Sequence, residues 1–343
     1  MRPDATPLLT DLLKAVSRSF YLTLRVLPAA VRPQIGLAYL LARATDTIAD
    51  TELVPVAERL RALDELRAHI LGHRRAPVAL GNLAAAQPER AGGGSNAERV
   101  LLERIDEIVA LLESFSPDDQ KHIREVLATI TGGQELDLQR FGAAGTESIV
   151  ALRNDAELDD YTYRVAGCVG EFWTKMCCAH LFTNTGLDEA ALLRDGVRFG
   201  KGLQLVNILR DLPRDLRQGR CYLPVERLQR VSLAPRDLLE AGNHARLRPV
   251  YDELLDLAQA HLAAGWDYTN RLPRSAARVR LACAWPILIG VKTLTQLRKE
   301  NPLDATRRVK VNRTAVRQIL MATLLRYPFR GAWTGLFDRM QSE

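Results

Sequence analysis

Two pairs of aspartates are the residues of this sequence with the clearest chemistry. Asp46 and Asp50 are four residues apart, and so are Asp211 and Asp215 much later in the chain. Each pair lies in an apolar segment with helical periodicity, where an ionised carboxylate is costly unless a positive group binds it. Carboxylate oxygens are ligands that Mg²⁺ prefers, and the metal in turn binds phosphate oxygens. The pairs therefore predict a site for a diphosphate bridged by Mg²⁺.

Polar residues upstream share a helix face with each aspartate pair. Tyr39 and Arg43 precede the first pair, and Gln204 and Asn207 precede the second, all at spacings of three or four residues. Such spacing puts the side chains on one face of a helix. A solvated helix face also carries aspartate pairs, but two pairs with amide, tyrosine or arginine groups beside them favour a ligand site.

Pro213 separates the two aspartates of the second pair. Proline lacks a backbone N–H and biases the preceding residue, Leu212, away from the helical conformation. We therefore expect this helix to kink or end near Leu212, so the one-face arrangement is better founded for the first pair than for Asp215.

Two further segments carry groups that could serve the same ligand. Ser17-Arg18-Ser19 places two hydroxyls beside a guanidinium that could hold phosphate oxygens, although this sequence is also common on helix surfaces. Arg220 and Tyr222 follow the second aspartate pair, where they could reach a phosphate or close the mouth of a cavity.

A segment of small residues follows Tyr161 at residues 165–170. Its two glycines, Gly167 and Gly170, each cost about 1 kcal/mol inside a helix, so they indicate close approach by another backbone or by a long ligand. Tyr161 precedes this face by one turn and could project its phenol into the same cavity. Tight helix packing without a ligand is the alternative.

The elements that must position these residues are helices. Most segments show apolar residues at helical spacing, and alternating strand patterns are scarce. We expect an all-α protein with roughly ten helices or more. The expected helices are residues 8–26, 32–50, 56–71, 97–115, 118–131, 158–182, 188–212, 244–270, 278–299 and 314–326.

A stretch rich in Gly and Pro at residues 72–96 predicts a flexible loop. Neither flank has the pattern of a self-contained domain. The two aspartate pairs lie on opposite sides of this loop and must meet if they share a metal. We therefore expect residues 1–343 to form a single domain whose helices surround a central cavity.

The composition is that of a soluble globular protein, with 47% apolar and 26% charged residues. A net charge of +6 favours anionic partners, but the basic residues are spread along the chain, so nucleic acid is not an expected partner. The five cysteines form no CxxC pair, and the six histidines show no zinc-ligand spacing. A reduced, cytoplasmic setting is the expectation.

The sequence predicts no membrane span and no signal peptide. No stretch reaches about 18 uncharged apolar residues, and the N-terminus lacks an apolar core. Residues 324–337 mix aromatic side chains with arginines, which would suit either peripheral contact with a membrane surface or docking on the body of the protein.

Taken together, these motifs resemble the squalene/phytoene synthase family, the head-to-head prenyl transferases with the trans-isoprenoid all-helical fold. The resemblance rests on residues 17–20, 39–50, 161–170 and 204–224, which run in the family's order over most of the chain. The first motif reads Asp-Thr-x-x-Asp and is most like that of squalene synthases. Thr47 stands where phytoene and dehydrosqualene synthases more often have a second aspartate.

The resemblance implies that two farnesyl diphosphates are joined head to head through presqualene diphosphate, with NADPH-dependent reduction to squalene. It implies Mg²⁺ binding by both aspartate pairs with Asn207, and proton handling by Tyr161. NADPH would be bound by Lys310 and Arg313. Phosphate oxygens would be held, or metal ligands oriented, by Arg18, Arg43, Gln204, Asn207 and Arg210.

Two departures from the family pattern stand out. Thr162 replaces a usual cysteine, and Asn312 replaces an arginine found in some squalene synthases. The C-terminal membrane span of the eukaryotic enzymes is missing, so we expect a bacterial-type, monomeric, cytoplasmic or membrane-peripheral protein.

Two alternatives to a reducing squalene synthase stay open. One is a non-reducing synthase that makes dehydrosqualene, phytoene or hydroxysqualene. The other is a non-catalytic family member acting as a binding or assembly factor, which loss of the aspartates would mark.

Overall fold

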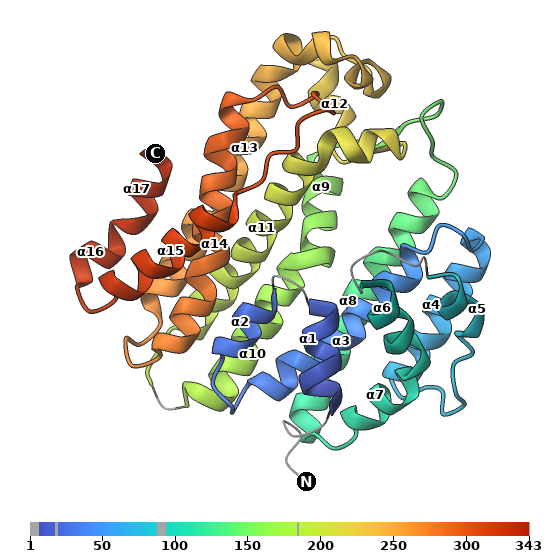
Figure 1. Ribbon diagram of the computed structural model, residues 1–343, viewed down its shortest axis with the longest axis vertical. Coiled ribbons are helices and arrows are strands. Elements are labelled where there is room, and N and C mark those ends of the chain that lie inside the picture. The colour runs from blue at the N-terminus through green and yellow to red at the C-terminus, as the bar shows by residue number, and fades with distance from the viewer. Residues whose placement is uncertain (1–6, 18–19, 88–93, 184, 343) are drawn as a thin grey trace. The chain divides into compact units, whose positions relative to one another are not determined.

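The protein is built almost wholly of helices (Figure 1). The computed structural model describes residues 7–17, 20–87, 94–183 and 185–342. Within these residues the strands are β1 (Val150–Ala151) and β2 (Arg220–Cys221), which pair in parallel with Val150 opposite Arg220. The prediction of an all-α protein is confirmed.

The chain divides into two compact units, of which unit 1 comprises residues 1–142 and 172–186. In this unit α3 packs against α8, α4 and α7. The elements of unit 1 are η2 (Leu8–Leu12), α1 (Leu13–Ser17), α2 (Phe20–Val26), α3 (Arg32–Ala49), α4 (Val56–Ile70), α5 (Gly81–Ala85), α6 (Gly94–Glu103), α7 (Ile105–Leu112), α8 (Pro117–Phe141) and the greater part of α10 (Cys168–Leu181).

Unit 2 comprises residues 143–171 and 187–343. Its long helices α11, α13 and α14 pack side by side (Figure 1). Besides the two strands, its elements are α9 (Asp155–Thr162), η3 (Tyr163–Gly167), α11 (Glu189–Arg217), α12 (Val225–Gln229), η4 (Pro235–Leu239), η5 (Ala241–Asn243), α13 (His244–Arg271), α14 (Ala277–Lys299), α15 (Arg313–Arg326), α16 (Arg330–Thr334) and α17 (Leu336–Ser342).

Helix α8 is longer than the sequence pattern predicts. It begins where the Ser116 hydroxyl accepts a hydrogen bond from the Asp119 amide at 3.2 Å, with Pro117 in the first turn. It then continues past two consecutive glycines and ends at Phe141. Packing against α3 and α4 offsets the cost of the glycines, which sequence periodicity could not foresee.

Other predicted helices are divided in the structure. Residues 8–26 form η2, α1 and α2, with residues 18 and 19 outside the described part. Residues 97–115 divide at Arg104 into α6 and α7, and residues 158–182 are interrupted by the π-helix η3. The loop predicted at residues 72–96 contains the short helix α5, and residues 88–93 lie outside the described residues.

Helix α11 continues through Pro213 to Arg217, beyond the predicted end at Leu212. A residue at position 213 would normally donate its amide hydrogen to the carbonyl of Leu209, and proline has no such hydrogen. The hydroxyl of Tyr251, on α13, instead donates to the Leu209 carbonyl at 2.9 Å, and Tyr251 is fully buried. The tertiary contact therefore satisfies the carbonyl and keeps Asp215 on the same helix as Asp211.

The small-residue segment after Tyr161 allows two backbones to touch. A Cβ atom added at Gly170 would lie 1.9 Å from the Gly196 carbonyl oxygen. A Cβ atom added at Gly200 would lie 2.0 Å from the Ala166 carbonyl oxygen. The segment therefore packs directly on α11, which agrees with the backbone-contact interpretation of its glycines.

No helix in the described ranges is long and apolar enough to cross a membrane. The prediction that residues 1–343 form one domain depends on how the two units join, and it stays a prediction.

Candidate functional site

The first aspartate pair lies on the polar face of α3. The opposite face of α3 is fully buried in unit 1 and consists of Leu37, Leu40, Leu41, Ala44 and Ile48. This packing fixes the rotation of the helix, so Tyr39, Arg43 and Asp46 are only partly buried, and Asp50, the C-cap residue, is exposed. The one-face arrangement predicted for this pair is therefore present.

Arg43 lies between two carboxylates. Its Nη1 donates to Asp46, and its Nη2 donates to Glu98 on α6. Desolvation would lower the pKa of Arg43, but Asp46 and Glu98 raise it overall. Glu98 was not among the predicted site residues, because it follows the glycine-rich stretch and carries no motif of its own.

Asp46 has an unusual affinity for its proton. Desolvation and the negative charge of Asp50 raise the pKa of Asp46 to about 7, against the opposing effect of Arg43. Its side chain still keeps 43% of its surface exposed, so an ion can reach it from solvent. Two carboxylates that repel each other at an accessible position form a donor set that fits a divalent cation.

Thr47, the residue that distinguishes the first motif, turns away from this face. It is buried, and its hydroxyl donates to the Arg43 carbonyl at 2.8 Å. Thr47 thus packs in the core and has its hydrogen bond satisfied within α3.

The second aspartate pair lies in the C-terminal half of α11, in unit 2. Arg210 makes a two-pronged contact with Asp211, in which Nε donates to Oδ1 at 2.9 Å and Nη2 donates to Oδ2. Arg308 approaches the same carboxylate at 3.6 Å. Burial alone would raise the pKa of Asp211, but Arg210, Arg308 and Arg214 together lower it.

Asp211 therefore differs from Asp46 in its electrostatics. Arginines lower the pKa of Asp211, whereas Asp46, whose partner Arg43 is shared with Glu98, has a raised pKa. On the same helix, the Asn207 amide donates to the Gln204 side-chain oxygen at 3.4 Å, so these two predicted residues share one face of α11.

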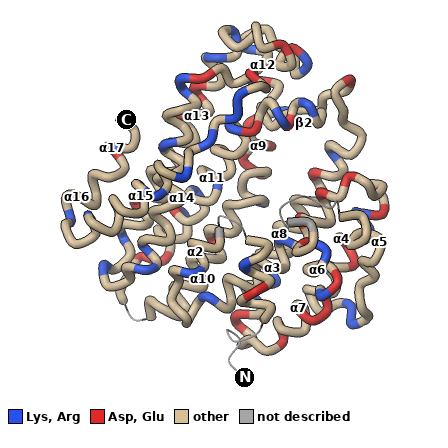
Figure 2. The backbone as a smooth tube through the Cα atoms, viewed as in Figure 1, with Lys and Arg blue, Asp and Glu red and all other residues tan. Residues whose placement is uncertain are grey.

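The connection between α14 and α15 runs beside the C-terminal end of α11. Arg217 donates to the Ala305 carbonyl at 3.1 Å, and Arg308 reaches Asp211. Basic residues occur along this connection (Figure 2). Lys310 is exposed there, and the exposed Arg313 begins α15. Arg308 was missed by the sequence analysis, although it stands two residues before Lys310.

Tyr161 and Tyr222 are brought together in unit 2. Their rings stack with centroids 4.6 Å apart, and Tyr222 is buried. The pairing of β1 with β2 fixes the chain just before Tyr222, because the Leu152 amide donates to the Cys221 carbonyl at 3.1 Å. Arg220 is the first residue of β2 and is partly exposed.

Other predicted residues are not brought into a site within one unit. Asp46 and Asp50 belong to unit 1, and Asp211 and Asp215 to unit 2. In neither unit do the described residues include three or more His, Cys, Asp or Glu side chains grouped closely enough to hold a metal. Whether the two pairs share a metal therefore stays a prediction.

The predicted phosphate-binding serines and arginine near the N-terminus are only partly described. Arg18 and Ser19 lie outside the described residues. Ser17 is buried, and its Oγ has no hydrogen-bond partner in the part of the chain that the structure covers.

The sequence matches one known family over most of its length. Residues 13–315 match the model of squalene/phytoene synthase. The chain belongs to the squalene/phytoene synthase family. The members of this family are prenyltransferase-type enzymes, and all four aspartates are present here, so the interpretation as a non-catalytic assembly factor is not supported.

Named relatives and solved structures agree with this assignment. The chain is 31% identical over 316 residues to the presqualene diphosphate synthase of Zymomonas mobilis, which covers 91% of this chain and 89% of the relative. It is 31% identical over 279 residues to the 15-cis-phytoene synthase of Synechocystis sp., covering 79% and 68%. The fold is similar to that of TcSQS in complex with the ligand BPH1237, with a TM-score of 0.74, 22% identity and coverage of 97% and 89%. The predicted trans-isoprenoid synthase fold is confirmed.

Proposed function

We propose that this enzyme condenses two farnesyl diphosphates head to head to give presqualene diphosphate. The observation that carries the proposal is the carboxylate pair of α3, in which Asp46 pairs with Arg43 and its side chain stays accessible. The presqualene diphosphate synthase relative supports the choice of product, because its similarity covers nearly the whole of both chains.

The residues that would hold Mg²⁺ are both aspartate pairs together with Asn207. Bound Mg²⁺ would stabilise the negative charge that develops on a departing diphosphate. The hard oxygen donors of these side chains suit that ion.

The arginines beside the aspartates would bind the diphosphate groups. Arg43 and Arg210 now contact Asp46 and Asp211. A cation bound by those carboxylates would release the guanidinium groups toward phosphate oxygens, for which their planar fork is well suited. Arg43 would keep its second carboxylate partner, Glu98, which orients it.

Tyr161 would accept or pass on the proton that is lost when the cyclopropyl ring closes. Its ring stacks on that of Tyr222, which fixes the orientation of the side chain. Gln204 and Asn207, one turn apart on α11, would orient phosphate oxygens on the same side of the helix as Asp211.

Reduction to squalene by NADPH is a second proposal for the same site. Its support is the position of the basic connection between α14 and α15. Arg308 in this connection contacts Asp211, and the nearby residues Lys310 and Arg313 are exposed. Exposed cations beside α11 fit the phosphate groups of a dinucleotide.

The test is the product formed from farnesyl diphosphate and Mg²⁺ with and without NADPH. Presqualene diphosphate without NADPH supports the first proposal, and squalene with NADPH supports the second. The same product at every NADPH concentration would refute reduction, with dehydrosqualene, phytoene or hydroxysqualene marking a non-reducing synthase. Absence of any condensation product would refute both.

Lys310→Ala refines the reduction test. We expect it to raise the NADPH concentration needed for squalene while leaving presqualene diphosphate formation unchanged, because the first half-reaction uses no hydride. Arg307→Ala is the matched control, since it removes the same charge from a side chain that pairs with Glu300 at 2.9 Å. An equal effect of both variants would argue against a specific role for Lys310.

A further inference from the structure

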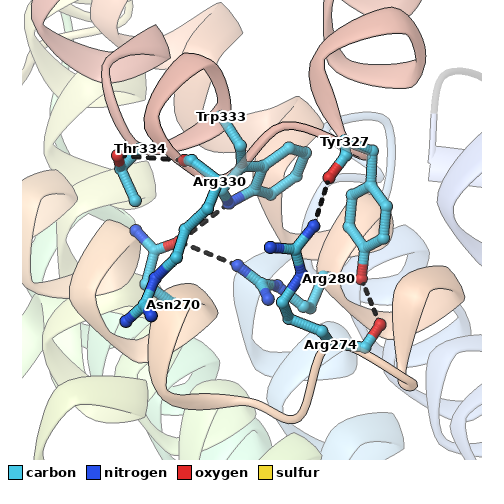
Figure 3. A pocket seen from close by; sticks show the side chains of 7 residues that line it. All are labelled: Asn270, Arg274, Arg280, Tyr327, Arg330, Trp333 and Thr334. Atoms are coloured by element: carbon cyan, nitrogen blue, oxygen red, sulfur yellow. Dashed lines mark hydrogen bonds between the residues drawn. The ribbon is translucent and has the colours of Figure 1, made fainter.

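Unit 2 contains a small pocket with a volume of about 270 Å³ (Figure 3). It is lined by residues of α13, α14 and α16, of the turn between α13 and α14, and by the residue that follows α15. Drug-sized ligands occupy pockets of roughly 300–1,000 Å³, so this one suits a smaller group. Three of its described lining residues are arginines and none is acidic. The lining consists of Asn270, Arg274, Arg280, Tyr327, Arg330, Trp333 and Thr334.

Arg280 is a buried cation that has no acidic partner in this pocket. The residue is only 4% exposed, and its Nε has no hydrogen-bond partner within the described ranges. Its guanidinium carbon lies 5.5 Å from the ring centroid of Tyr327 and 5.2 Å from that of Trp333. Aromatic faces attract a cation but do not neutralise it, so the charge stays largely uncompensated.

The electrostatics of the pocket agree with this. Desolvation lowers the pKa of Arg280, and the charges of Arg274 and Arg330 act in the same direction, against an opposing contribution from Tyr327. Arg280 is the fourth residue of α14, and the first turn of this helix has no acidic residue. The positive end of that helix dipole therefore adds to the field of the arginines.

Hydrogen bonds hold the pocket in shape (Figure 3). The Asn270 side-chain oxygen accepts from Arg280 Nη2 at 2.9 Å and from Trp333 Nε1 at 2.7 Å. Arg274 Nη2 donates to the Tyr327 and Pro328 carbonyls at 2.9 Å each. A binding group that is ordered before its ligand arrives loses less entropy on binding.

We propose that this pocket binds a phosphate group. Phosphate oxygens match the planar fork of arginine, and the anion would compensate the buried charge of Arg280. The pocket is separate from the aspartate site: Arg271, next to Asn270, contacts Asp195 on α11, and Asp195 lies about 24 Å along that helix from Asp211.

Two sources could supply this phosphate: a small phosphate compound in solution, or the headgroup of an anionic lipid. A lipid headgroup is considered because apolar side chains are exposed next to the pocket. Met321, Leu324 and Leu325 are exposed at helical spacing on α15, and Phe329 is exposed beside Arg330. Such side chains beside arginines could enter a bilayer surface. The shared chemistry is the phosphate, and the experiment separates the sources.

The experiment measures binding by two probes. Inorganic phosphate is titrated while the melting temperature and the heat of binding are recorded, and vesicles of phosphatidylglycerol with phosphatidylcholine are compared with phosphatidylcholine alone in sedimentation. We expect Arg330→Gln to weaken binding of whichever probe the wild type binds by about tenfold or more. Arg280→Met should do the same. Arg317→Gln, which removes an exposed charge from α15 outside the pocket, is the control and should bind as wild type does.

Each outcome bears on the proposal. Phosphate binding that is lost in Arg330→Gln supports a soluble ligand, and selective binding to phosphatidylglycerol vesicles that is lost in the same variant supports a lipid headgroup. Arg330 is exposed, and the substitution leaves its backbone carbonyl, which accepts from the Thr334 hydroxyl at 3.1 Å, unchanged. Arg330→Gln should therefore fold even if Arg280→Met does not. The proposal is overturned if wild type binds neither probe, or if Arg317→Gln loses binding as much as Arg330→Gln.

Discussion

The hydroxyl of Tyr251 replaces the hydrogen bond that Pro213 cannot make, and Tyr251→Phe tests this directly. The variant removes one oxygen from a fully buried side chain and leaves the Leu209 carbonyl without its donor. An unsatisfied buried carbonyl costs about 1–3 kcal/mol. For a cooperative unit of 150–250 residues, that corresponds to a fall in melting temperature of roughly 2 to 12 °C.

A double-mutant cycle with Pro213→Ala isolates this effect from general loss of packing. In the Pro213→Ala background the new amide can donate to the Leu209 carbonyl, so Tyr251→Phe should cost at least about 1 kcal/mol less than it does in wild type. The assay is thermal and urea unfolding of all four proteins, followed by circular dichroism.

An equal loss of stability from Tyr251→Phe in both backgrounds would contradict this role, because the hydroxyl would then have no specific link to the proline. A functional readout accompanies the stability measurement. Since Asp215 follows Pro213 on α11, a loosened helix should also raise the Mg²⁺ concentration needed for half-maximal activity in Tyr251→Phe, and Pro213→Ala should restore it.

Two further predictions concern the candidate site itself. Tyr161→Phe should lower kcat by about 100-fold or more. Its melting temperature should change little, because the stacking on Tyr222 remains and only the hydroxyl is lost. Steady-state kinetics equal to those of wild type would instead make Tyr161 a packing residue. Asp46 binds its proton more tightly in the folded state, with a pKa of about 7 against roughly 4 unfolded. The stabilisation that this bound proton gives to the folded state is therefore lost as pH rises from about 4 to 7. Metal-free Asp46→Asn should therefore melt higher than wild type at pH 8, and a lower melting temperature there would contradict the sign of the shift.

The sequence could predict features that depend on one helix alone. The face of α3 that carries Tyr39, Arg43 and Asp46 follows from spacing, because its opposite face is an unbroken apolar stripe. The glycines of residues 165–170 likewise indicated a close backbone contact, which the structure places against α11.

Features that depend on contacts between distant segments could not be predicted. Glu98 reaches Arg43 from another helix, and Arg308 reaches Asp211 from a connection with no regular structure. The continuation of α11 past Pro213 depends on Tyr251, which is far away in sequence. Local patterns contain no information about such partners, so the expected end at Leu212 was wrong for a tertiary reason.

Thr47 illustrates a different limit of sequence comparison. Its position in the first motif suggested a link to the squalene synthases, yet its side chain is buried and bonded to its own helix. The burial of Thr47 does not indicate which product is formed, and the product has to be determined by chemistry.

The most direct test of the central claim is condensation of labelled farnesyl diphosphate by wild type, Asp46→Asn and Asp211→Asn in the presence of Mg²⁺. We predict that wild type forms presqualene diphosphate and that each variant loses on the order of 10³-fold in turnover while keeping its helical circular dichroism spectrum. Asp64→Asn, which changes an exposed carboxylate on α4, should retain full activity. Wild-type turnover in either site variant, or a loss explained by unfolding, would contradict the assignment of these aspartates as the metal-binding groups.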